Sequence, residues 1–233
     1  MKFIAKLKES WKPALSSLIC GVGNFCYLSW METLELIKSG FSAPVLRLKL
    51  LLWQAYRFSP PHRLINRYSQ TPAPPESDMI YGEPLVFTLR HMFETVKLKP
   101  EETMLDLGCG RGLGVLVAGL LFQAQALGIE LIPEMVARAG EIARILGIND
   151  RVAFWAGNFL ELEIPQAQVI YLCWTTFSPP TRADLEAKIS LLPAGTRIIS
   201  LTHPLKGSKF KTRKTEKLYF TWGKATVYYQ EIV

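Results

Sequence analysis

Cysteine and histidine are scarce in this chain, and the few present are scattered. Among the 233 residues, the four cysteines are Cys20, Cys26, Cys109 and Cys173, and the three histidines are His62, His91 and His203. No two cysteines have the Cys-x-x-Cys spacing, which argues against a disulfide scaffold and against a zinc site. We therefore expect no metal site and a reducing, cytoplasmic compartment. The chain also has no internal repeat.

Acidic residues are rare in two segments of the chain. Residues 1–71 carry ten basic and three acidic residues, and residues 206–217 carry six basic residues against Glu216 alone. Such asymmetry favours an anionic partner, either phospholipid or nucleic acid, although each basic run can also be a solvated surface. Phe210 is the one aromatic residue of the second run, so that run lacks a platform on which bases would stack, and the nucleic-acid signal is weak.

Charge is absent altogether from residues 13–31, which follow a lysine-rich start. Three explanations stay open: a membrane span, a helix lying on a membrane surface, or a helix packed on the protein. The apolar residues of 15–37 fall on one helical stripe, which suits a helix with one face packed on a surface better than a helix surrounded by lipid. Residues 45–58 form a second basic, apolar and aromatic stretch, suited either to a bilayer interface or to a core-facing helix.

What the sequence does contain is a glycine-rich turn between two short apolar runs. Residues 103–112 read Thr-Met-Leu-Asp-Leu-Gly-Cys-Gly-Arg-Gly, and after an apolar helical stretch the run Ala-Leu-Gly-Ile-Glu ends at Glu130. Strand, glycine turn, helix, strand and acid form the first half of a nucleotide-binding α/β unit. A dinucleotide site would need a third glycine at position 113, which is leucine. Asp106, two residues before the first glycine, suits S-adenosylmethionine instead, since it can meet the cationic amino-acid end while Glu130 accepts bonds from the ribose hydroxyls.

Alternating patterns of strand and helix predict the rest of the fold. Strands are expected near 103–107, 126–130, 152–156, 168–173 and 196–202, with helices at about 84–96, 113–122, 133–146 and 181–192. Leu218 to Trp222 and Ala225 to Ile232 flank Gly223-Lys224 and predict a β-hairpin. We predict an α/β fold with the doubly wound, seven-stranded sheet of class I methyltransferases, a C-terminal hairpin and a helical N-terminal extension.

The domain boundaries follow from composition. Residues 1–58 are expected to form the helical, basic and apolar extension, through which the protein would associate with a membrane. Residues 59–78 contain five prolines and predict a linker or a lid. Residues 79–233 are expected to form the methyltransferase domain.

These residues resemble the non-SET "disruptor of telomeric silencing" lysine methyltransferases and their bacterial relatives. Tyr81-Gly82-Glu83 is similar to the opening motif of that family, whose acid holds the amino-acid end of the cofactor, and Gly157-Asn158-Phe159-Leu160 is similar to its Gly-Asp-Phe-Leu motif at the adenine. A weaker resemblance is to the membrane-anchored lysine methyltransferases of the ATP-synthase c-subunit type. Together, motifs and resemblance imply an S-adenosylmethionine site made by Tyr81, Glu83, Asp106, Gly108, Cys109, Gly110, Gly112, Glu130, Leu131, Asn158 and Phe159.

Two positions depart from the family pattern. Asn158 stands where the family has Asp, and its carbonyl can accept the same bond from the adenine amino group. Residues 169–177 read Val-Ile-Tyr-Leu-Cys-Trp-Thr-Thr-Phe, and the last five of them stand where the family has Asn-Asn-Phe-x-Phe. The resemblance therefore carries over the methyl donor but leaves the specificity for lysine open. We expect an apolar acceptor channel lined by Trp174, Phe177 and Tyr81, in which Thr175 or Thr176 orients the acceptor. The alternative for Trp174 is a core aromatic that caps the strand.

Three functions remain open from the sequence. The first is a protein-lysine methyltransferase acting at or near a membrane. The second is a methyltransferase for a lipid or another apolar small molecule. The third is a non-catalytic S-adenosylmethionine-binding or nucleic-acid-binding module, against which the acids Glu83, Asp106 and Glu130 argue.

Overall fold

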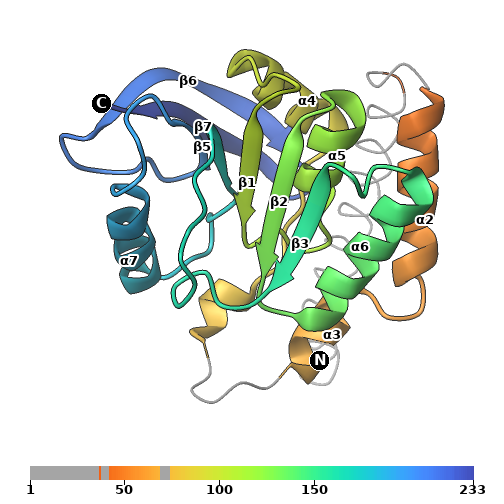
Figure 1. Cartoon of the computed structure of the whole chain (residues 1–233). Coiled ribbons are helices and arrows are strands. Elements are labelled where there is room, and N and C mark those ends of the chain that lie inside the picture. Colours follow the sequence, from red (N-terminus) through yellow and green to blue (C-terminus); the bar gives the residue numbers. More distant parts are fainter. Residues whose placement is uncertain (1–36, 38–41, 69–73) are drawn as a thin grey trace, which may run out of the picture. The chain divides into compact units, whose positions relative to one another are not determined.

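The strands of the described chain form one seven-stranded sheet, in the order β3-β2-β1-β4-β5-β7-β6 (Figure 1). This computed structural model describes residues 37, 42–68 and 74–233. The first five strands run parallel, and β7 is antiparallel to both β5 and β6. The predicted doubly wound sheet with a terminal hairpin is thus confirmed. The strands are β1 (Thr103–Leu107), β2 (Gln125–Glu130), β3 (Val152–Ala156), β4 (Val169–Leu172), β5 (Arg197–Leu201), β6 (Phe210–Phe220) and β7 (Gly223–Ile232).

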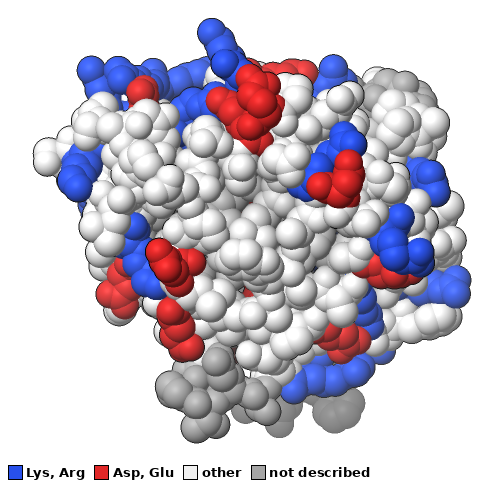
Figure 2. Space-filling view, viewed as in Figure 1, with Lys and Arg blue, Asp and Glu red and all other residues white. Residues whose placement is uncertain are grey.

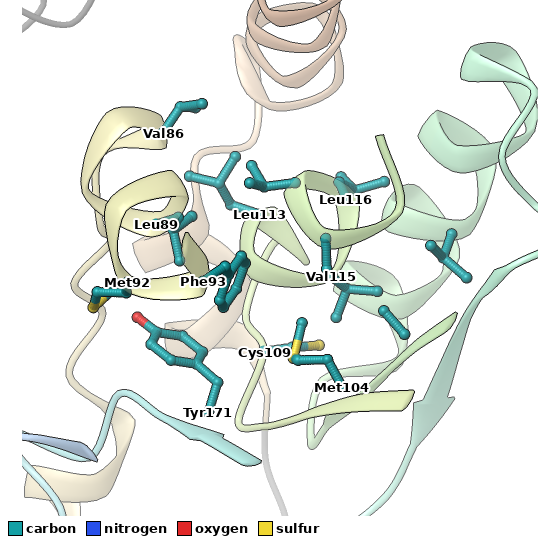
Figure 3. Close-up of a cluster of buried hydrophobic side chains, with 14 of the residues drawn as sticks. Val86, Leu89, Met92, Phe93, Met104, Cys109, Leu113, Val115, Leu116 and Tyr171 are labelled. Atoms are coloured by element: carbon teal, nitrogen blue, oxygen red, sulfur yellow. The ribbon is translucent and has the colours of Figure 1, made fainter. Parts of the chain in front are cut away.

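Helices cover both faces of the sheet and enclose two hydrophobic cores. One face packs against α4 (Val86–Thr95), α5 (Leu113–Leu121) and α6 (Pro133–Leu146), and the other against α7 (Pro179–Ile189). Successive residues of a strand point to opposite faces, so Met104 joins the first core and Leu105 the second. In the first core Phe93 packs edge-on against Phe122 and Tyr171, with ring centroids 5.6 and 6.1 Å apart; Figure 3 shows Phe93 and Tyr171.

The ends of the helices are encoded locally. α6 begins at Pro133, whose fixed φ suits a first turn, and ends at Gly147, whose φ of 72° closes the helix. α7 follows Ser178, whose hydroxyl accepts a bond from the backbone N–H of Thr181 at 3.4 Å. α6 has the predicted bounds, whereas α7 lies two to three residues earlier than the predicted 181–192.

Helix α2 (Ala43–Tyr56) belongs to the same compact unit as the sheet, which begins at Ser42. It packs beside α6, where Arg138 donates to the carbonyl oxygens of Ala55 and Ser59 at 2.7 and 3.1 Å. The expected division after residue 58 is therefore corrected for this helix, because its apolar residues complete the first core. The predictions for residues 13–31, and for 15–37 apart from Ile37, lie outside the described residues. The side chains that α2 buries are Val45, Leu48, Leu52 and Tyr56.

The segment expected to be a linker or lid contains two short helices. These are α3 (Pro61–Arg67) and the 3-10 helix η1 (Glu76–Met79). Leu64 of α3 is buried, and Asp78 of η1 accepts bonds from the Ser178 and Thr181 hydroxyls at 3.4 and 2.5 Å. Asp78 thereby fastens η1 to the start of α7.

Most of the basic run 206–217 lies in strand β6. The strand begins at Phe210 and lies at the edge of the sheet, where β7 is its one neighbour among the described strands. Residues 211–215 are all exposed, so both faces of this stretch are polar and no alternation of apolar residues marks it as a strand. Lysines on an edge strand also hinder pairing with another chain. Figure 2 shows basic side chains at the upper left, where β6 lies in Figure 1.

Candidate active site

A cavity of about 470 Å³ opens at the carboxyl ends of the parallel strands β1, β2 and β4. The strand order reverses between β1 and β4, which is where open α/β sheets bind their ligands. Residues 74–84 form one wall, and the glycine turn after β1 forms another. Among the predicted cofactor residues, the cavity is lined by Tyr81, Glu83, Asp106, Gly108, Cys109, Gly110, Glu130, Leu131, Asn158 and Phe159.

Asp106 at the end of β1 is a buried acid that lines the cavity. Its side chain is 2% exposed, and within the described chain no donor reaches its Oδ1 atom. Burial raises the pKa of this carboxyl well above its usual range, and the nearby charge of Glu130 raises it further. A Cβ atom at Gly114 would come within 2.5 Å of Asp106 Oδ2, so the glycine in the first turn of α5 makes room for the carboxylate. A buried acid without a partner is suited to a cationic ligand.

Glu130 at the end of β2 links the ends of β1 and β2 through hydrogen bonds. Its Oε2 accepts from the backbone N–H of Gly110 at 2.8 Å, and its Oε1 accepts from that of Ile132 at 3.0 Å. Burial raises the pKa of Glu130, while these backbone bonds act against the rise. Each carboxylate oxygen can accept a second bond, which matches the two hydroxyls of a ribose.

The glycines of the turn have different tasks. Gly110 has a φ of 54°, and a Cβ atom there would lie 2.9 Å from the ring of Tyr81. Gly112, which the sequence assigned to the cofactor, does not line the cavity: a Cβ atom there would lie 2.5 Å from Phe154. Gly112 therefore permits close packing of α5 on the sheet. The thiol of Cys109 is also turned to the sheet, since a Cβ atom at Gly128 would lie 2.6 Å from its sulfur.

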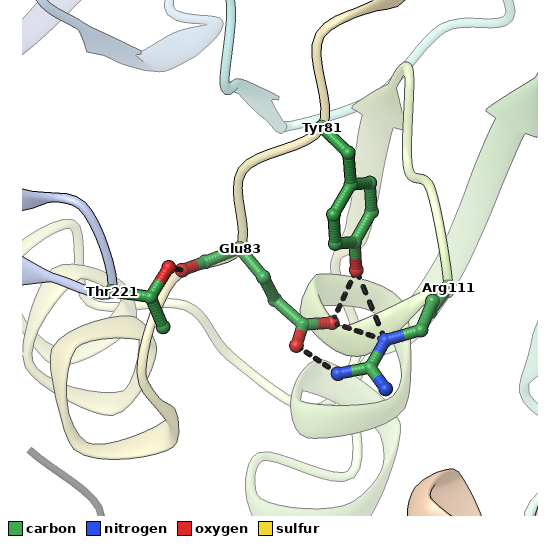
Figure 4. Close-up of polar contacts among 4 residues, drawn as sticks. All are labelled: Tyr81, Glu83, Arg111 and Thr221. Atoms are coloured by element: carbon green, nitrogen blue, oxygen red, sulfur yellow. Dashed lines mark hydrogen bonds and ion pairs between the residues drawn. The ribbon is translucent and has the colours of Figure 1, made fainter. Parts of the chain in front are cut away.

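Tyr81, Glu83 and Arg111 form a polar network beside the cavity (Figure 4). The Tyr81 hydroxyl donates to Glu83 Oε1 at 2.8 Å, and Arg111 Nε donates to the same oxygen at 3.1 Å. Arg111 Nη2 forms an ion pair with Glu83 Oε2. Burial alone would lower the pKa of Arg111, but the Glu83 carboxylate outweighs burial and raises it. Arg111 is a functional residue that the sequence motifs did not single out, although an arginine inside the glycine turn was an available signal.

The residues after β3, from Asn158 to Glu161, also line the cavity. Asn158 Oδ1 accepts from the backbone N–H of Leu160 at 2.9 Å, and Asn158 Nδ2 donates to Glu161 at 3.0 Å. The carbonyl expected to meet adenine is therefore already part of a local turn, with one lone pair left. Phe159 stacks on Phe177, with ring centroids 5.6 Å apart. Phe159 and Phe177 thus give the cavity an aromatic wall.

The segment after β4 divides between the cavity and the core. Thr175, Thr176 and Phe177 line the cavity, as does Cys173. Trp174 does not: it is 1% exposed in the second core, and its Nε1 donates to the His203 carbonyl at 2.9 Å. Successive side chains of an extended segment point to opposite sides, so Trp174 points away from its neighbours. The predicted place of Trp174 in an acceptor channel is thereby corrected.

A different tryptophan lines the cavity. Trp222 lies in the turn between β6 and β7, is 39% exposed, and stacks on Phe220 with centroids 4.8 Å apart. A Cβ atom at Gly82 would lie 2.9 Å from its ring, which explains a glycine between Tyr81 and Glu83. The sequence predicts this hairpin, but no pattern in it marks Trp222 as a residue of the cavity.

Comparison with known proteins agrees with the site. Residues 60–222 match the model of the family described as histone methylation protein DOT1. A protein-lysine N-methyltransferase of Saccharolobus islandicus is 29% identical over 121 residues, which cover 51% of this chain and 73% of the relative.

Solved structures show the same fold. An RNA methyltransferase from Salinibacter ruber, in complex with S-adenosyl-L-homocysteine, is 26% identical with a TM-score of 0.54, over 62% of this chain and 90% of that one. A geranyl diphosphate C-methyltransferase from Streptomyces coelicolor, at 16% identity, has a TM-score of 0.51 over 63% and 76% of the two chains. Asp106, which has no hydrogen-bond partner among the described residues, fits S-adenosylmethionine together with the bonded Glu130 and the glycine turn. This chain belongs to the DOT1 family and is an S-adenosylmethionine-dependent methyltransferase.

Proposed function

We propose that the enzyme methylates the side-chain amine of a lysine in a protein. The observation that carries the proposal is the apolar wall of the cavity, to which Ile80, Phe177 and Trp222 contribute. A lysine has an unperturbed pKa of about 10.4, and its amine can attack only when neutral. An apolar wall disfavours the ammonium form and so lowers the pKa of an amine that enters. The DOT1 family and the protein-lysine methyltransferase relative support the same acceptor.

Residues of this chain can align such an amine. S-adenosylmethionine, when bound, supplies a methyl group activated by a positively charged sulfur. Thr175 Oγ1 lies 3.0 Å from Thr202 Oγ1, so one hydroxyl can donate to the other and still accept an N–H of the amine. That bond would leave the lone pair of the amine free to face the methyl group. Thr202 has a φ of 69°, which is rare for a β-branched residue, so the fold holds this hydroxyl in place at some cost.

Transfer of labelled methyl groups to a lysate that contains membranes tests the proposal. We expect label in protein, recovered as methyl-lysine after hydrolysis, and none with Asp106→Asn. A second candidate is an apolar small molecule or lipid, favoured by the same wall and by Cys173 and Trp174 at positions where the family has asparagines. Label that is extracted with the lipids, while protein stays unlabelled, would establish that candidate instead.

A further inference from the structure

Helix α2 has two apolar faces, and the described chain covers one of them. Val45, Leu48, Leu52 and Tyr56 are buried against the catalytic unit. Leu46, Leu50 and Trp53 recur at intervals of four and three residues, so they share a different face. They are 39, 52 and 58% exposed, and Phe58 just after the helix is 76% exposed. Four large apolar side chains within 13 residues are unusual on the surface of a soluble domain, where single ones are normal.

Basic side chains accompany this face. The guanidinium carbon of Arg57 lies 5.5 Å from the ring centroid of Trp53 and 4.6 Å from that of Phe58. The sequence has no acidic residue from Leu36 to Pro75, while this stretch carries six Lys and Arg residues. In Figure 2 the right-hand edge, where α2 lies in Figure 1, shows basic side chains and uncharged surface, with acidic side chains further in.

We propose that the face made by Leu46, Leu50, Trp53 and Phe58, the α2 face, docks on an anionic phospholipid bilayer. Leucine and aromatic side chains enter the boundary between headgroups and acyl chains, and arginine beside them meets lipid phosphates. α2 has 14 residues, fewer than the roughly 20 that a span requires. No helix within the described ranges is long and apolar enough to cross a membrane. The helix therefore lies along the surface.

A bilayer suits this face better than the other candidates. Leu46 and Leu50 have neither a ring on which a base would stack nor a group that binds phosphate, so nucleic acid leaves them uncovered. The buried side of the same helix carries Tyr56, which contacts Arg111 of the active-site network. A docked α2 would thus hold the cavity close to the membrane. The docking is independent of which acceptor the enzyme methylates.

The test is flotation of the full chain with vesicles. Vesicles of phosphatidylserine and phosphatidylcholine are compared with vesicles of phosphatidylcholine alone, at low and raised salt. We expect the wild type to float with the anionic vesicles, and the double variant Leu50→Ser/Trp53→Ser to bind them about tenfold less tightly or worse. The matched control is Leu191→Ser/Trp155→Ser, which removes the same residue types from exposed positions outside α2, 81 and 47% exposed. We expect this control to float like the wild type.

Each contrary outcome overturns the proposal. A double variant that floats like the wild type would mean that another part of the chain binds lipid. A wild type that stays unbound at low salt would mean that something else covers the face, such as residues 1–41 of the chain. Binding of single-stranded RNA that is lost in the α2 variant, without vesicle binding, would assign the face to nucleic acid. Thermal melting of both double variants is the control for their folding.

Discussion

The ring of Tyr56 in α2 lies against the guanidinium of Arg111 in the glycine turn, with 5.2 Å between the guanidinium carbon and the ring centroid. Arg138 of α6 lies against the same ring at 4.9 Å. Arg111 in turn pairs with Glu83, which lines the cavity. One aromatic side chain therefore links helix α2 to the polar network beside the cavity, through contacts worth about 0.5–2 kcal/mol each.

Removal of this ring is expected to weaken cofactor binding. Tyr56→Ala frees Arg111 from one of its contacts, and we expect the affinity for S-adenosylmethionine to fall about threefold to tenfold, as measured by calorimetry. Tyr56→Phe keeps the ring, and the lost hydroxyl has no hydrogen-bond partner among the described residues. The affinity of this control should stay within about twofold of the wild type. Equal affinities of all three proteins would mean that Arg111 keeps its position without the ring.

Glu130→Ala is expected to reduce the affinity for S-adenosylmethionine by about 1.5–3 kcal/mol, the range for lost bonds to a charged group. The loss has two sources, the ribose hydroxyls and the Gly110 N–H that Glu130 holds at 2.8 Å. Glu141→Ala is the matched control, because Glu141 is exposed on α6 and pairs with Arg144 alone among the described residues. Calorimetric titration should show no change for the control. Equal thermal stabilisation of wild type and Glu130→Ala by the cofactor would contradict the ribose role.

The sequence predicted the parallel half of the sheet well because local signals mark it. β1 and β3 have the predicted bounds, since each is a short, largely apolar run that is followed by a glycine, Gly108 or Gly157. The start of β6 was not predicted because residues 211–215 are all polar and exposed, so they show no alternation of apolar and polar residues. Tertiary pairing with β7 creates that strand.

The lining of the cavity was predicted where backbone geometry decides it and missed where side-chain direction decides it. Asp106 and Glu130 end parallel neighbours, so they meet at one edge whatever the rest of the fold does. Trp174 and Trp222 are a different case. Both are aromatic residues near strand ends, and only the three-dimensional packing shows that the first enters the core and the second lines the cavity.

The two tryptophans should therefore respond differently to truncation. Trp222→Ala opens the apolar wall, and we expect kcat/KM for the acceptor to fall about tenfold or more while cofactor affinity stays nearly unchanged. Trp174→Ala removes a completely buried ring and its bond to His203, so we expect a loss of about 3–5 kcal/mol in the free energy of unfolding. Steady-state kinetics and chemical denaturation measure the two effects. If the Trp174→Ala protein kept wild-type stability but lost turnover, Trp174 would have the role in the acceptor channel that the sequence predicted.

The protonation of Asp106 is expected to make both stability and cofactor binding depend on pH. Its folded-state pKa lies well above its usual value, because burial and the charge of Glu130 disfavour the ionised form. The folded chain thus holds this proton more tightly than the unfolded chain, and stability without cofactor falls as pH rises from about 4 through the raised pKa. Asp106→Asn removes the buried charge, so we expect the variant to melt above the wild type at pH 8 and the difference to shrink towards pH 5.

Bound cofactor should reverse this order of melting temperatures, so that the wild type melts above Asp106→Asn. Its cationic end favours the ionised form of Asp106, so binding to the wild type should weaken as pH falls through the raised pKa, and binding to Asp106→Asn should be weaker and nearly independent of pH. Melting curves with and without S-adenosylmethionine between pH 5 and 8 measure both effects. A variant that melts below the wild type without cofactor, yet gains as much from the cofactor, would show that Asp106 is a structural acid. The negative charge of the cavity would then have to come from Glu83 or Glu130.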